Sequence, residues 1–102
     1  MVVVNAVLST TEEDINALKE AIGIMEKASR EETGCVDYTF SVEVSDPNTL
    51  RITEKWETVE ALQAHMTTPH MAEFQTALAG LSSKSMEAKV YEISRELPFP
   101  NW

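Results

Sequence analysis

The sequence predicts an α+β domain with the element order β-α-β-β-α-β, built as one antiparallel sheet with its helices on one face. Three observations support this fold. The chain starts with an apolar, β-branched run, its middle carries two stretches of alternating apolar and polar residues, and two other stretches show the three- and four-residue spacing of amphipathic helices. With 102 residues, the chain has room for one domain of ordinary size.

The first strand and the first helix are expected within residues 2–34. Residues 2–8 are apolar on both alternating faces except at Asn5, as in a strand that is covered on both sides. Residues 9–14 then supply candidate N-caps, and Thr10 and Glu13 have capping-box spacing. A helix should begin there and end at Thr33-Gly34. Its predicted buried stripe is Ile15, Leu18, Ile22 and Met25.

Two strands joined by a turn are expected next, because alternation with a period of two predicts half-buried strands. The turn-forming residues 45–48 separate them, so they should pair as an antiparallel hairpin. The first strand carries Val36, Tyr38, Phe40, Val42 and Val44 at every second position. The second strand carries Leu50, Ile52, Glu54 and Trp56 in the same way.

The last third of the sequence predicts a broken helix and a final strand. Thr58 can cap a short helix, and Thr68-Pro69 opens another, because proline suits the first helical turn and disfavours helix in the residue before it. Gly80 is a plausible end of this second helix, and residues 84–94 offer a last strand. The apolar residues of the two helices are Val59, Leu62, Met66, Phe74, Ala77, Leu78 and Leu81.

This order is the ferredoxin-like arrangement, which leaves one sheet face without helices. Val3, Val7, Val42 and Val44 make that face too apolar to stay wet, so we expect two chains to pack sheet to sheet as a homodimer. We expect residues 1–94 to form the domain. The tail, residues 95–102, carries two aromatic residues and is expected either to dock on the partner subunit or to fray.

Charge and cysteine content exclude several classes of protein. The chain has 17 acidic and 8 basic residues and a net charge of −9, so binding to a nucleic-acid backbone is not expected. Cys35 is the only cysteine, which excludes an internal disulfide and favours a small buried role. The apolar start is too short to cross a bilayer and has no basic leader, so we expect a cytoplasmic protein that does not associate with membranes.

Three polar residues stand out as candidates for chemistry. His65 shares a helix face with apolar residues, so its ring should point inward, either as a satisfied core residue or as a base. His70 lies across the helix break and is expected either to be exposed or to hydrogen-bond the loop after the neighbouring helix. The two histidines lack the spacing of two metal ligands on one helix, and no third ligand has matching spacing, so no metal is expected. Asn5 is a lone amide in an apolar strand and must have partners or line a wet pocket.

The remaining candidates are residues that would either line an apolar cleft or simply pack the core. No Gly-rich phosphate loop, nucleophile elbow or dinucleotide fingerprint is present in the sequence, so no nucleotide or flavin cofactor is expected. The candidate substrate contacts are Tyr38, Trp56, Leu62, Met66, His70 and Phe74.

Three segments, ETGCVDY at 32–38, EKWE at 54–57 and AHMTTPHM at 64–71, resemble the antibiotic biosynthesis monooxygenase superfamily, and most closely its small quinol monooxygenase-like members. The resemblance extends over residues 2–94 and implies a dimeric α+β barrel. Quinol-type members oxidise phenolic substrates with O₂ and without metal or flavin. The resemblance therefore implies a cofactor-independent monooxygenase that acts on a small phenolic or quinol-type substrate.

The resemblance also implies roles for particular residues. Proton transfer from a phenol of pKa about 10 to a histidine of pKa about 6.5 is uphill by roughly 4.8 kcal/mol, so the pocket must also stabilise the anion. We hypothesise that His65 is the base or hydrogen-bond partner, and that Asn5 and Tyr38 donate to the substrate oxygen. The anion would then pass an electron to O₂.

Other activities in the superfamily leave alternatives open. Haem-degrading members use an asparagine, a tryptophan and a histidine; Asn5 matches the first, but His65 and Gln75 occupy the other two positions, so haem degradation is not expected. Members resembling the phosphorylated-autoinducer processing enzyme perform isomerisation-type chemistry, in which His65 would be a proton shuttle. A third alternative is a dimeric protein that binds a small ligand without turning it over.

Overall fold

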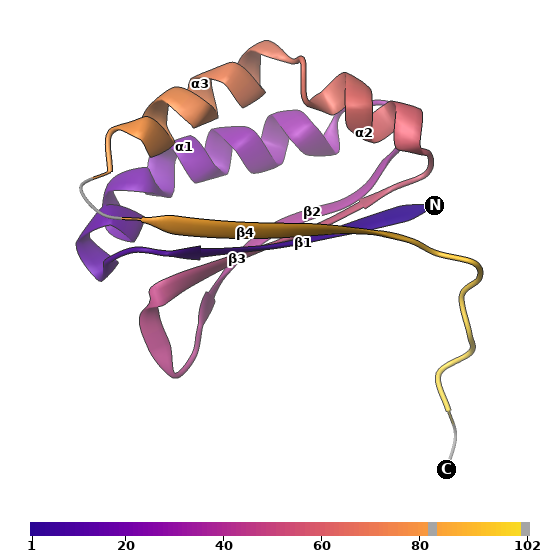
Figure 1. The fold of residues 1–102 in the computed structure, drawn as a ribbon. Coiled ribbons are helices and arrows are strands. Elements are labelled where there is room, and N and C mark those ends of the chain that lie inside the picture. The colour runs from indigo at the N-terminus through magenta and orange to yellow at the C-terminus, as the bar shows by residue number, and fades with distance from the viewer. Residues whose placement is uncertain (82–83, 101–102) are drawn as a thin grey trace.

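The structure, a computed structural model, describes residues 1–81 and 84–100 and contains four strands and three helices in that part of the chain. The strands form one antiparallel sheet in the order β2-β3-β1-β4, and all helices lie over the same face of it (Figure 1). The predicted ferredoxin-like α+β fold is confirmed. The elements are β1 (Val2–Ser9), α1 (Glu12–Arg30), β2 (Cys35–Glu43), β3 (Asp46–Trp56), α2 (Val59–His65), α3 (Pro69–Ala79) and β4 (Ser85–Glu92).

Helix α1 begins one residue later than the predicted capping box. Its N-cap is Thr11, whose hydroxyl oxygen accepts a hydrogen bond from the backbone N–H of Asp14 at 3.1 Å. The backbone N–H of Thr10 donates to the carbonyl of Asn48, which ties Thr10 to the first residues of β3. The Thr10 hydroxyl instead donates to the Asp14 carboxylate at 2.6 Å.

The break between α2 and α3 follows the predicted caps. The hydroxyl oxygen of Thr58 accepts from the backbone N–H of Ala61, and that of Thr68 accepts from the backbone N–H of Met71. The Thr68 hydroxyl also donates to the His65 carbonyl at 2.8 Å, which joins the end of one helix to the start of the next. These bonds fix one histidine at the end of α2 and another in the first turn of α3.

The core lies between the sheet and the helices, because side chains of a strand alternate between its two faces. On β1 the helix-facing residues are buried, whereas Val3 and Val7 on the other face are half-buried. The buried apolar residues of the sheet are Val2, Val4, Ala6, Leu8, Tyr38, Leu50, Ile52 and Trp56, and those of the helices are Ile15, Leu18, Met25 and Phe74.

The predicted apolar face of the sheet is only partly correct. Val42 is paired with Leu50, whose side chain is buried in the core, so Val42 is on the helix side of the sheet. Val44 lies outside β2, in the turn to β3, and is fully exposed. Only Val3 and Val7 of the four valines lie on the open face, and the homodimer stays a prediction.

The tail runs away from the domain after the last strand (Figure 1). Phe99 is 93% exposed, and Leu97 is also exposed. Trp102 lies outside the described residues. Docking of residues 95–102 on a partner subunit stays a prediction.

No helix among residues 1–81 and 84–100 combines the length and the apolarity that a membrane crossing requires.

Gly34 offers a test of the packing between the α1–β2 loop and α2. Its φ is +84°, and a Cβ at this position would lie 2.7 Å from the Cβ of Ala61. We expect Gly34→Ala to lower the free energy of unfolding by about 1–3 kcal/mol, because both the backbone conformation and the close approach disfavour a side chain. Urea unfolding measures this.

Gly23→Ala is the matched control. Gly23 is inside α1, and a Cβ there would meet no heavy atom within 4 Å. This substitution should raise the free energy of unfolding by roughly 0.5–1 kcal/mol, because alanine favours helix. Equal effects of the two substitutions would contradict the assigned role of Gly34.

Candidate functional site

An apolar cavity of about 460 Å³ lies between the sheet and helices α2 and α3. This volume falls in the range of small-molecule sites. The sheet contributes Val4, Ala6 and Ile52 to its walls, and the helices contribute Leu62, Met66 and Phe74. The edge strand β4 adds Met86, Ala88 and Val90.

The predicted substrate contacts divide into two groups. Tyr38, Leu62, Met66 and Phe74 line the cavity. Trp56, His65 and His70 are not part of its wall. Instead, the His65 ring lies against Tyr38 and Trp56, with ring centroids 5.2 Å and 4.8 Å apart respectively. His65 is therefore behind the cavity wall rather than on it.

Asn5 lies on the opposite face of the sheet. Its neighbours along β1, Val4 and Ala6, both line the cavity, so the side chain between them points the other way. Asn5 is exposed and stands between Thr53 and Lys89 in the sheet register. The structure therefore does not bring Asn5 and His65 together within one chain, because the sheet separates them, and their predicted roles at a site stay predictions.

Glu54 is the acidic residue on the cavity wall, and the sequence-based site did not include it. It is 8% exposed, and the indole N–H of Trp56 donates to its carboxylate at 3.0 Å. Burial raises the pKa of Glu54; the Trp56 hydrogen bond and His65 lower it by less. The available signal was its position between Ile52 and Trp56 in an inward-facing series.

Tyr38 is the second polar group in this part of the cavity. Its side chain is buried, and burial raises the pKa of the phenol far above its ordinary value, with the nearby Glu54 charge adding to the effect. The Tyr38 phenol therefore keeps its proton and is available as a hydrogen-bond donor.

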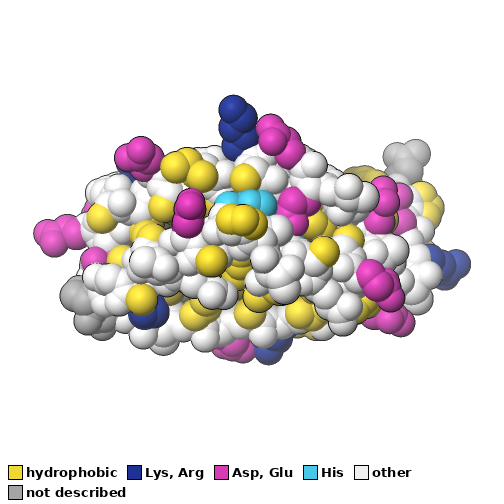
Figure 2. Space-filling view, turned by 90° about the horizontal axis from the view of Figure 1, so that it is seen from above, with side chains coloured by type: hydrophobic (Ala, Val, Ile, Leu, Met, Phe, Trp, Pro, Cys, Tyr) yellow, Lys and Arg dark blue, Asp and Glu magenta, His cyan; other side chains and the backbone are white. Residues whose placement is uncertain are grey.

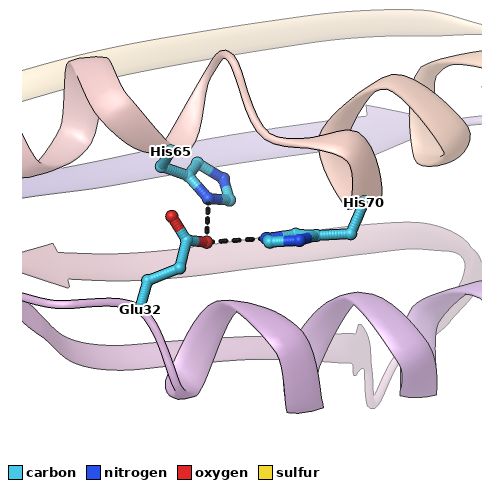
Figure 3. A group of neighbouring side chains, drawn as sticks. All are labelled: Glu32, His65 and His70. Carbon is cyan, nitrogen blue, oxygen red and sulfur yellow. Dashed lines mark hydrogen bonds and ion pairs between the residues drawn. The ribbon is translucent and has the colours of Figure 1, made fainter.

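A cluster of three polar side chains lies beside this cavity, where three segments of the chain meet. Glu32, in the turn after α1, reaches between the end of α2 and the start of α3 (Figure 3). One oxygen of its carboxylate lies 2.7 Å from Nδ1 of His65 and 2.7 Å from Nε2 of His70. Because a carboxylate only accepts, both rings donate an N–H to it. We call Glu32, His65 and His70 the histidine-glutamate cluster.

The histidine-glutamate cluster is partly open to solvent. The side chains of Glu32 and His70 are 15% and 18% exposed, whereas that of His65 is 1% exposed. A histidine reaches the helix-side surface with acidic side chains on both sides of it (Figure 2). Within the described part of the chain, Nε2 of His65 is buried without a hydrogen-bond partner. The donor atoms of the three residues lie within 4.8 Å of one another, so this cluster is where a metal ion could be held.

Sequence reasoning missed Glu32 because no local pattern connects it to the histidines. It precedes His65 by 33 residues and His70 by 38 residues. Neither strand nor helix periodicity relates positions so far apart.

Comparison with known proteins gives matches that cover most of the chain. A family model described as antibiotic biosynthesis monooxygenase matches residues 1–77. A crystal structure of a proposed antibiotic biosynthesis monooxygenase from Deinococcus radiodurans has a TM-score of 0.90 and 27% identity, covering 99% of this chain and 100% of that one. One from Nitrosomonas europaea has a TM-score of 0.85 and 21% identity, covering 93% and 100%, which shows the fold alone.

An uncharacterised protein from Synechocystis is 35% identical over 66 residues. The match spans 65% of this chain but only 45% of the Synechocystis protein.

The raised pKa of Glu54 has a consequence for stability. A carboxyl group whose pKa is higher in the folded than in the unfolded protein lowers the free energy of unfolding as pH rises from the unfolded pKa through the folded pKa. We expect Glu54→Gln to gain stability relative to the wild type as pH rises from about 4.3 upward, and to keep this advantage at neutral pH. Urea unfolding at several pH values measures the difference.

Glu60→Gln removes one negative charge from an exposed position on α2 and serves as the control. A stability difference between Glu54→Gln and the wild type that stays constant or falls with rising pH would show that Glu54 is not destabilised by burial.

Proposed function

The chain belongs to the antibiotic biosynthesis monooxygenase family, and on that basis we propose that it oxidises a small phenolic or quinol-type substrate with O₂ in the cavity. The observation that carries the proposal is the buried carboxylate of Glu54 on the wall of an otherwise apolar cavity of about 460 Å³. Apolar walls suit an aromatic ring, and one buried base suits its hydroxyl group. The resemblance to quinol-type members supplies the reaction class.

The dimensions of the cavity favour a substituted or bicyclic quinol. A dry cavity of about 150 Å³ is enough to bind benzene. The space of about 460 Å³ between Ile52, Leu62, Phe74 and their neighbours leaves room for a second ring or a side chain. In the proposed binding mode, one quinol hydroxyl donates to the Glu54 carboxylate. The Tyr38 hydroxyl donates to a substrate oxygen as negative charge develops on that oxygen.

Glu54 has to accept a proton from a much weaker acid. With ordinary pKa values of about 10 for a phenol and about 4.3 for glutamate, the transfer is uphill by roughly 7.8 kcal/mol. Burial raises the pKa of Glu54 and so reduces this gap. We propose that the substrate transfers its hydroxyl proton to Glu54 and one electron to O₂ at the same time. Concerted transfer avoids forming a full phenolate in an apolar site.

The overall reaction balances without an added reductant. One quinol and one O₂ give one hydroxylated quinone and one water. One oxygen atom enters a ring C–H bond, and the two electrons and two protons released when the quinol becomes a quinone reduce the other oxygen atom to water. The substrate is therefore also the reductant, and the proposed reaction uses neither metal nor flavin.

His65 has a positioning role in this proposal rather than the role of base. Its ring packs against Tyr38 and Trp56, so it supports the two side chains that donate within the site. Glu32 accepts from Nδ1 of His65 and thereby fixes the orientation of the ring. An isomerase that uses His65 as a proton shuttle would need this ring on the cavity wall, whereas Glu54 and Tyr38 are the titratable side chains that line the cavity.

Oxygen uptake with a panel of benzene- and naphthalene-derived quinols tests the proposal. The wild type is expected to consume one O₂ per quinol above the protein-free rate, and ¹⁸O₂ should label the quinone product. Glu54→Gln should lower kcat/KM by about 10²–10⁴-fold, because it removes the base but keeps an oxygen that can accept from Trp56.

Glu60→Gln, exposed on α2, is expected to leave the rate unchanged. A Glu54→Gln variant as active as the wild type would contradict the assignment of the base. Proton exchange into a substrate without O₂ uptake would favour the isomerase, and thermal stabilisation by quinols without turnover would favour a binding protein.

A further inference from the structure

The histidine-glutamate cluster has the composition of a metal site, and we propose that Glu32, His65 and His70 bind Zn²⁺. The two residues at positions 65 and 70 are the only histidines of the chain. Two imidazoles and one carboxylate are ligands that zinc accepts, whereas Mg²⁺ and Ca²⁺ favour sites made of oxygen alone. Three protein ligands leave a fourth position for water.

The three donor atoms come from three separate segments of the chain and lie close together. Nδ1 of His65 and Nε2 of His70 both aim at the same oxygen of Glu32, at 2.7 Å each (Figure 3). The donor atoms lie within 4.8 Å of one another. Bonds of about 2.0–2.1 Å to a tetrahedral ion place donors roughly 3.4 Å apart, so the ion would take the place between the rings that the Glu32 oxygen occupies.

Two of the three ligands are free to make this small adjustment. Glu32 is in the turn between α1 and β2, and His70 is in the first turn of α3 with 18% of its side chain exposed. The His65 ring packs against the rings of Tyr38 and Trp56, which also contact each other. The site therefore has one fixed ligand and two that can approach it, with an opening to solvent for the fourth ligand.

The electrostatics favour a cation at this position. The chain carries a net charge of −9. Arg30, close to Glu32 in sequence, is already engaged by the Glu26 carboxylate and the Tyr38 carbonyl. Among the ion pairs of the described residues, Glu32 has only the two imidazoles as partners. A bound Zn²⁺ would add two positive charges beside the Glu32 carboxylate.

The ion would join three segments of the chain and would not itself react with quinol or O₂. It would connect the α1–β2 turn, the end of α2 and the start of α3. The three ligand residues themselves do not line the cavity. Its expected effect is on stability. Zinc binding is measured without quinol, so a failure of zinc binding and a failure of quinol oxidation are distinguishable outcomes.

Nitrogen NMR of the full chain, labelled with ¹⁵N-histidine and titrated with Zn²⁺ alone, tests the site directly. With only two histidines, every imidazole signal is assigned by one substitution. We expect Nδ1 of His65 and Nε2 of His70 to move from N–H to metal-bound shifts at one equivalent of Zn²⁺. At free Zn²⁺ about 100-fold above Kd, Tm should rise by about 10 °C or more.

Glu32→Gln is expected to weaken zinc binding by at least about 100-fold. Even the loss of a residue that only hydrogen-bonds a metal ligand lowers metal affinity by about 10–100-fold. Glu31→Gln, the exposed neighbouring glutamate, is the matched control and should bind as the wild type does. His70→Gln provides a second variant at a partly exposed position if Glu32→Gln does not fold. Unchanged imidazole shifts in excess Zn²⁺, or equal binding by Glu32→Gln and Glu31→Gln, would overturn the proposal.

Discussion

The hydrogen bond from the Trp56 indole to the Glu54 carboxylate is the interaction on which the candidate site depends. Strand alternation places both side chains on the helix-facing side of β3, where a carboxylate would otherwise be buried without a partner. One indole N–H does not offset the whole cost of burial, which raises the pKa of Glu54. An ordinary sheet position thereby holds a base on the wall of an apolar cavity.

The histidine-glutamate cluster supports this arrangement from behind. Thr68 joins the end of α2 to the start of α3, and this joint sets both histidines toward Glu32. The His65 ring in turn packs on Tyr38, which lines the cavity, and on Trp56, which donates to Glu54. The helix break, the cluster and the cavity wall are therefore one connected structure, although their residues are far apart in sequence.

Features with local causes could be predicted from the sequence, and features with distant causes could not. Thr58 and Thr68-Pro69 predicted the broken helix, because a cap acts on the next three residues. Alternation placed Glu54 in one series with Ile52 and Trp56, but its importance depends on the cavity that this face of the strand lines. The lone amide of Asn5 indicated a need for hydrogen-bond partners, but not which face of the sheet it lies on. No spacing rule relates Glu32 to the histidines.

The protonation of Glu54 in the presence and absence of a bound phenol is the most direct test of this account. Carbon NMR of protein labelled at the glutamate side-chain carboxyl carbon measures it through a pH titration. We expect Glu54 to titrate above the ordinary glutamate range, and we expect a bound phenol to shift the Glu54 signal far more than that of Glu60. A Glu54 signal that titrates with the exposed glutamates and does not respond to the phenol would contradict it.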